Sequence, residues 1–192
     1  MSGVLSILLE LVAYRRLRNR GSNKLAPLIS AIGMSIVLAE SMRIMTDSRY
    51  VGSPRFMEKK SLGTVFGGDL RLDNMIIIFA GLILYIILNQ FVQRTRLGKA
   101  IRAVSMNEDA AKLMGVNLNF VVSGTFLVGG LMTGAAGFFY VLKYENTVFN
   151  IGFGLGIAAF TAAILGGIGN IKGAFYGGIA LGLDRKSTRL NS

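Results

Sequence analysis

Three stretches of the chain contain no charged residue, and their lengths restrict what the chain can fold into. They cover residues 74–93, 113–142 and 146–171, which are 20, 30 and 26 residues long. A helix needs about 20 apolar residues to cross the hydrocarbon core of a bilayer. The pattern predicts an all-α protein, built as a polytopic bundle of transmembrane helices.

The composition supports a membrane protein and excludes several kinds of chemistry. Charged residues make up 16% of the chain, whereas a soluble domain carries about 25%. The net charge of +11 comes from basic residues that lie between apolar runs, so we expect the partner to be the lipid bilayer and not nucleic acid. The chain has no cysteine and no histidine. We therefore expect no thiol or imidazole catalysis, no metal site and no cofactor.

The apolar segments predict one partial transmembrane helix and five further spans. The partial helix covers residues 1–14; its basic residues follow the apolar run, whereas those of a signal peptide precede it. The other spans are predicted at about 25–45, 74–92, 119–142, 153–168 and 172–183. From Asp184 the sequence reads DRKSTRLNS. We expect residues 184–192 to be a non-native tail, and residues 1–183 to be part of a longer membrane domain.

Lysine and arginine counts predict the orientation, because positively charged loops stay in the cytoplasm. The loop at 15–24 has five basic and no acidic residues, and the loop at 93–118 has five basic and two acidic residues, net +3. The loop at 46–73 has five basic and four acidic residues, net +1. Loops 15–24 and 93–118 are therefore predicted to be cytoplasmic and loop 46–73 external.

Glycines spaced four residues apart recur in the second half of the chain. Such spacing lets helix backbones approach closely in lipid. The candidates for helix packing are Gly130, Gly134, Gly169, Gly173 and Gly177. The alternative is that the last two helices line a moving interface or a translocation path.

Ionisable residues inside a membrane span are functional candidates. Glu40 and Arg43 lie three positions apart in the span at 25–45, so they can pair on one face of the helix. The simpler interpretation is an ion pair near the membrane surface, and the alternative is a contact with substrate or another subunit. The other spans show no relay of carboxylates, which argues against a proton-coupled pump.

The loop at 93–118 carries the most informative motif. Asn107 can cap a short helix that begins at Glu108 and Asp109, since acidic residues suit a helix N-terminus. Ala110 and Ala111 would give this helix a small surface, and Gly115 can end it in the left-handed conformation. A solvated connecting loop is the simpler alternative. No GxxxxGK[ST] motif occurs in the chain, so any nucleotide hydrolysis must come from another chain.

The motif Glu108-Asp109-Ala110-Ala111, followed by Gly115, resembles the coupling loop of ABC importer permeases. Other segments resemble more narrowly the permease subunits of branched-chain amino acid importers. These segments are 14–33, 98–103, 111–116, 125–129 and 159–169. The resemblance extends over about 14–183.

The resemblance implies a permease subunit of the bacterial inner membrane that is not itself an enzyme. Its implied partners are a second, homologous permease, two cytoplasmic ATPases and a periplasmic or extracellular substrate-binding protein. Glu108, Ala110, Ala111 and Gly115 would contact the ATPase, and transport would proceed by alternating access. The substrate-binding residues stay unknown. A sugar importer permease and a secondary transporter without an ATPase remain alternatives.

Overall fold

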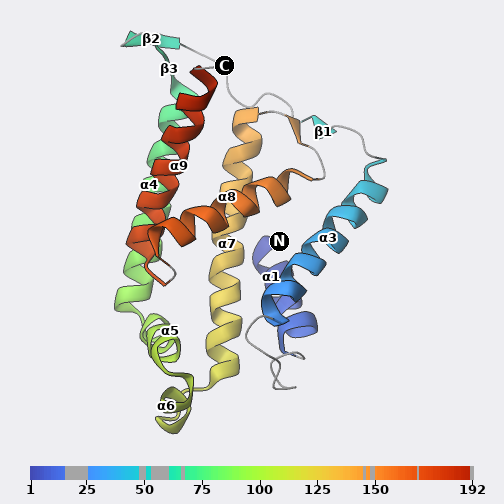
Figure 1. The fold of residues 1–192 in the computed structure, drawn as a ribbon, viewed down its shortest axis with the longest axis vertical. Helices are drawn as coiled ribbons and strands as arrows, with labels where there is room; N and C mark the ends of the chain where they lie inside the picture. The colour runs from blue at the N-terminus through green and yellow to red at the C-terminus, as the bar shows by residue number, and fades with distance from the viewer. Residues whose placement is uncertain are drawn as a thin grey trace. The chain divides into compact units, whose positions relative to one another are not determined.

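The computed structural model describes residues 1–15, 26–47, 51–52, 61–65, 68–144, 146–147, 150–167 and 169–190. The chain divides into two compact units, Met1–Val148 and Phe149–Ser192. The first unit contains α1 (Ser2–Leu9), η1 (Glu10–Tyr14), α3 (Ala26–Met45), α4 (Leu72–Arg94), α5 (Arg96–Met106), α6 (Glu108–Leu113) and α7 (Leu118–Tyr144); the second contains α8 (Ile151–Gly166) and α9 (Ile171–Leu190) (Figure 1).

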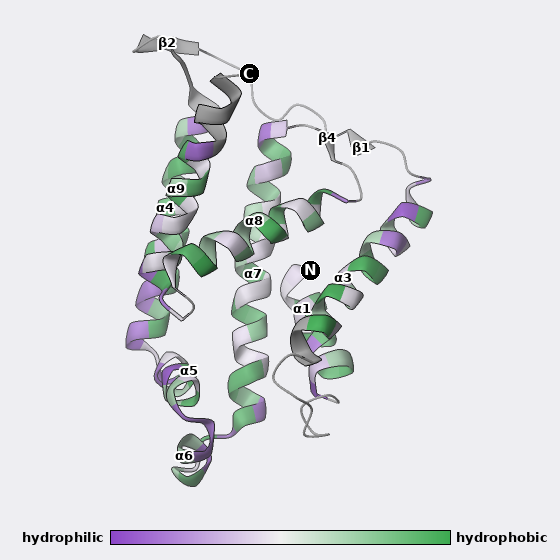
Figure 2. Ribbon diagram, in the orientation of Figure 1, coloured by the Kyte–Doolittle hydropathy of each residue, from purple (hydrophilic) through white to green (hydrophobic). Residues whose placement is uncertain are grey.

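The predicted helical class is confirmed. Among the described residues, the helices Asn74–Arg94 and Leu118–Tyr144 are long and apolar enough to cross a bilayer, and shorter apolar helices cover Ser2–Tyr14 and Ile151–Gly166. Figure 2 shows hydrophobic residues along much of α4 and α7. Large apolar side chains on both helices are exposed in the isolated chain, including Ile78 and Phe138. Exposed apolar faces on helices of this length suit contact with lipid or with other membrane helices.

The first unit contains two pairs of short strands, one of which joins distant parts of the chain. β1 (Val51–Gly52) pairs antiparallel with β4 (Asn146–Thr147), and β2 (Ser61–Val65) pairs antiparallel with β3 (Gly68–Arg71). The β1–β4 pair brings the loop predicted at 46–73 to the C-terminal end of α7. This contact agrees with both segments lying on one side of the membrane. Apart from Arg15, the predicted basic loop 15–24 lies outside the described residues.

The second unit is a hairpin of α8 and α9 in which the two backbones touch. A Cβ atom added at Gly173 would lie 1.8 Å from the carbonyl oxygen of Gly166, and one added at Gly177 would lie 2.3 Å from the carbonyl oxygen of Ala162. No side chain fits at either position without separating the helices. Small residues thus set the distance between α8 and α9.

Gly169 differs from its predicted role as a packing residue. It lies in the turn between α8 and α9 with φ +92°, and a Cβ atom there would meet nothing within 4 Å. The turn needs glycine at position 169 because the backbone there has a positive φ, which residues with a side chain adopt with difficulty. The turn also contains Gly167, with φ +90°.

Two segments are more helical than predicted. The polar segment at 93–118 contains both α5 and α6, where one short helix was expected. α9 continues past Asp184 to Leu190, whereas the predicted span stops at residue 183. No helix end marks the change in composition at Asp184.

Candidate functional site: the α5–α6 loop

A tight turn directs the chain from α4 into α5. The hydroxyl of Thr95 accepts a hydrogen bond from the backbone N–H of Gly98 over 3.0 Å, which caps the start of α5. Gly98 is buried, and a Cβ atom there would lie 2.3 Å from the carbonyl oxygen of Val92. The turn therefore requires glycine at this position because the backbone of α4 occupies the space of a side chain.

Asn107 separates α5 from α6 and begins α6, as predicted. Its side-chain oxygen accepts hydrogen bonds from the backbone N–H groups of Asp109 and Ala110, both over 3.0 Å. These N–H groups have no partner within the helix, so the cap satisfies both. Lys112 in the last turn pairs with Glu108 at 2.9 Å and with Asp109 at 3.6 Å. The hydrogen bond with Glu108 raises the pKa of Lys112.

The end of α6 is closed by two backbone hydrogen bonds around Gly115. The N–H of Gly115 donates to the carbonyl oxygen of Lys112, and the N–H of Val116 donates to that of Ala111, both over 3.0 Å. Gly115 has φ +82°. This pattern is a Schellman motif, which favours glycine because side chains disfavour the left-handed conformation. The left-handed conformation predicted for Gly115 is present.

The two alanines of the motif lie in different environments. Ala110 is exposed, whereas Ala111 is only 5% exposed and is buried by the chain's own residues. The expectation that Ala111 contacts an ATPase needs correction, because its side chain already packs inside this chain. Of the predicted residues, Glu108 and Ala110 remain on the accessible surface of α6.

Three large apolar side chains around α6 were missed in the sequence. Met106, Leu113 and Met114 are 88%, 88% and 84% exposed. They lie in a segment whose other exposed side chains are largely charged or polar, beyond the ends of α4 and α7. We call these three residues the apolar tip. A sequence search for apolar residues on both flanks of the acidic motif would have found them.

The loop is anchored on α7. A Cβ atom added at Gly124 would lie 2.8 Å from a methyl carbon of Leu97 in α5, and Val121 is 3% exposed. The side chain of Asn117 accepts a hydrogen bond from the N–H of Phe120 at the start of α7. The segment from α4 to α7 therefore holds a defined shape through local caps and through packing on α7.

A family model described as "Branched-chain amino acid transport system / permease component" matches residues 3–190. The chain belongs to this family. The predicted resemblance to branched-chain amino acid importer permeases is therefore confirmed. No solved structure matches the chain.

Individual relatives agree with the family assignment. The chain is 37% identical over 182 residues to the high-affinity branched-chain amino acid transport system permease protein BraD of Pseudomonas aeruginosa, covering 91% of this chain and 57% of BraD. It is 36% identical over 178 residues to LivH of Escherichia coli, which has the same description, with the same two coverages. The fructose import permease protein FrcC of Rhizobium meliloti is 24% identical over 176 residues, covering 87% of this chain and 49% of FrcC. The chain thus spans little more than half the length of BraD and LivH.

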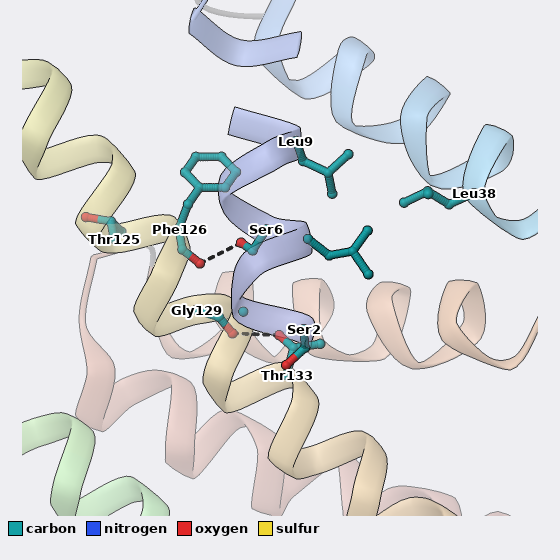
Figure 3. Close-up of a pocket in the computed structure, with 10 residues that line it drawn as sticks. Ser2, Ser6, Leu9, Leu38, Thr125, Phe126, Gly129 and Thr133 are labelled. Atoms are coloured by element: carbon teal, nitrogen blue, oxygen red, sulfur yellow. Dashed lines mark hydrogen bonds between the residues drawn. The ribbon is translucent and has the colours of Figure 1, made fainter. Parts of the chain in front are cut away.

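An apolar cavity of about 570 Å³ lies between α1, α3 and α7 (Figure 3). Its lining includes the hydroxyls of Ser6, Thr125 and Thr133, but these donate to the backbone carbonyls of Phe126, Val121 and Gly129. None of the ten lining residues is charged. The cavity therefore suits hydrocarbon better than the charged ends of an amino acid.

Two charged sites in the described apolar helices, at Glu40–Arg43 and at Glu10, differ in burial. Arg43 donates from Nε to Glu40 over 2.8 Å, so the predicted pair forms, and both side chains are exposed. Glu10 in η1 is fully buried and was overlooked among the apolar residues 1–14. A single carboxylate in an apolar segment was the signal that could have found it.

Proposed function

We propose that the chain forms part of the membrane-spanning permease subunit of an ATP-binding-cassette importer that takes up branched-chain amino acids. The family match and the similarity to the branched-chain amino acid permeases BraD and LivH support the substrate class. The apolar helices α4 and α7 support a multi-pass membrane protein. We place it in the bacterial inner membrane, with loops 15–24 and 93–118 in the cytoplasm and loop 46–73 outside.

The observation that best supports this function is the shape and surface of α6. Its two ends are fixed by Asn107 and Gly115, and the apolar tip is exposed outside the long apolar helices. Exposed apolar side chains on a rigid element mark a surface for protein contact. We propose that the apolar tip, with Glu108 and Ala110, docks against a cytoplasmic ATPase subunit.

In this mechanism the ATP is hydrolysed by separate subunits. Two ATPases, a second permease and a substrate-binding protein complete the importer. ATP binding and hydrolysis move α6, and the rigid helices joined to it carry the motion into the membrane. The permease then opens alternately to the two sides. Ala111 is buried and supports α6 from within the chain. Gly115 is exposed in the turn that follows α6, and we propose that it stays part of the surface facing the ATPase.

The alternatives have weaker support. A sugar importer permease would also be driven by separate ATPase subunits. The chain is 24% identical to the fructose permease FrcC, compared with 37% to BraD, so the amino acid permease is the better supported of the two. A secondary transporter would work without an ATPase. Uptake measured with radiolabelled leucine and with fructose separates the first two functions, and copurification of an ATPase excludes the third.

The apolar tip provides the direct test. In the permease assembled with its partners, Leu113→Gln should lower the amount of ATPase that copurifies and the transport rate together. Ser105→Gln is the matched control, because Ser105 is also exposed in the same segment and is already polar. Normal ATPase recovery and transport with Leu113→Gln and Met114→Gln combined would contradict docking through α6.

A further inference from the structure

Glu10 links the first helix to α7 through a buried polar contact. The hydroxyl of Ser123 donates to Oε2 of Glu10 over 2.7 Å, between residues 113 positions apart in the chain. Nε of Arg15 lies 3.8 Å from Oε1 of the same carboxylate. A buried carboxylate is stable only when hydrogen bonds or opposite charges compensate for its lost hydration. These contacts therefore hold the Glu10 carboxylate of η1 at one position against α7.

Close packing continues from this contact along α1. A Cβ atom added at Gly130 would lie 2.5 Å from Cβ of Ser6, and one added at Gly134 would lie 2.8 Å from Cβ of Ser2. The Ser6 hydroxyl donates to the carbonyl oxygen of Phe126 (Figure 3). The two helices are thus antiparallel and meet without space for larger side chains at Gly130 and Gly134. Gly130 and Gly134 thus both lie in the close contact between α1 and α7.

The contact also falls where the first helix changes its winding. Glu10–Tyr14 form a π-helical turn, and the ring of Tyr14 packs edge-on against that of Phe126 at 4.8 Å between centroids. A π-helical turn is uncommon and often lies at a functional position. Here it includes Glu10 and Tyr14, which both contact α7.

The part of α7 that contacts Glu10 also packs against α5, the helix that precedes α6. Ser123 contacts Glu10, and its neighbour Gly124 packs against Leu97 of α5. One turn of α7 is therefore held between η1 and α5. A displacement of α5 and α6 would act on α7 at the position where η1 is attached.

We propose that α1, η1 and α7 move as one rigid body during transport, and that Glu10 is the positioning residue that sets their register through Ser123. The proposal rests on the proposed importer function, and it adds the path by which motion at α6 enters the membrane. Glu10 contacts no substrate in this role. Its carboxylate holds η1 to α7, while the close contacts at Gly130 and Gly134 keep the helices together.

The test measures the distance between α1 and α7 in different states of the transport cycle. The chain has no cysteine, so spin labels can be placed on Leu8→Cys and Phe138→Cys, at exposed positions of α1 and α7. In the assembled permease, the label-to-label distance should be the same without nucleotide and with trapped ATP. A distance that changes between these states overturns the rigid body.

Substitutions of Glu10 test the positioning role in the same labelled protein. Glu10→Gln keeps an oxygen that can accept from Ser123 and should keep the wild-type distance. Glu10→Leu has no acceptor for the Ser123 hydroxyl, so the distance should shift and the transport per ATP hydrolysed should fall. Ser123→Ala should reproduce this loss and add little to Glu10→Leu. An unchanged distance and unchanged coupling in Glu10→Leu overturn the role of Glu10.

The labelled pair also separates this proposal from the proposed function. The nucleotide-free distance can be compared between wild type and Glu10→Leu in the permease alone, so this part of the test needs no ATPase contact through α6. Loss of ATPase binding in wild type would contradict the importer function alone. A protein that is merely destabilised by Glu10→Leu would lose transport and ATP hydrolysis in parallel, with no change in their ratio, and that result also overturns the positioning role.

Discussion

The N–H of Val116 donates to the carbonyl oxygen of Ala111 over 3.0 Å, and this bond closes the last turn of α6 around Gly115. Because Gly115 has φ +82°, replacing it with a β-branched residue should strain the turn by roughly 1–2 kcal/mol. Gly115→Val should lower ATPase association and transport while the permease still enters the membrane.

The control for this substitution is Gly81→Ala. Gly81 lies in the middle of α4, and a Cβ atom there would meet nothing within 4 Å. Gly81→Ala should therefore leave transport unchanged. Equal activity of Gly115→Val and wild type would show that the left-handed turn is dispensable.

Asn107→Ala should destabilise α6, because two backbone N–H groups lose their cap. The expected cost is about 1 kcal/mol, and it should appear as faster hydrogen exchange at residues 108–113. Asn107→Asp keeps an oxygen acceptor at the same position and should preserve the protection. If exchange in Asn107→Ala matches wild type, the cap does not hold α6.

Ala111→Asp and Ala110→Asp should have different consequences although the residues are neighbours. Ala111 is buried within the chain, so an unpaired carboxylate there should lower the amount of folded permease in detergent. Ala110 is exposed, so Ala110→Asp should leave the folded amount unchanged and reduce ATPase binding. Size-exclusion profiles of the purified permease measure the first effect and copurification measures the second. Equal folding of both variants would contradict the burial of Ala111.

Even one added methyl group should separate α8 from α9. Gly173→Ala and Gly177→Ala place a carbon against backbone oxygens of the facing helix, at 1.8 Å and 2.3 Å, so both should lower the melting temperature of the permease in detergent. Gly178→Ala is the control in the same helix, because a Cβ atom there meets nothing within 4 Å. A melting temperature that is the same in all three variants would argue against the close approach.

The orientation can be tested with single cysteines, since the chain has none. Ser105→Cys should be protected from an impermeant thiol reagent on whole cells, and Ser61→Cys should react, because the surrounding loops differ in net positive charge. Permeabilised cells provide the control for accessibility of Ser105→Cys. Labelling of Ser105→Cys alone on whole cells would reverse the topology.

The amino-acid sequence by itself determined the helical class, the long apolar helices and both ends of α6. These features depend on local physics. Charge-free runs of sufficient length form helices that suit a bilayer, Asn107 caps the N–H groups that directly follow it, and Gly115 supplies a conformation that its own lack of a side chain permits.

Only the tertiary structure decided which side chains face inward and which distant residues meet. Ala110 and Ala111 are identical in sequence terms, and packing alone buries Ala111 and exposes Ala110. Gly169 has the same spacing as Gly173, but it lies in a turn and not in a helix contact. The partner of Glu10 is 113 positions away, and spacing along one helix cannot predict such a contact, because it depends on how two separate helices are placed against each other.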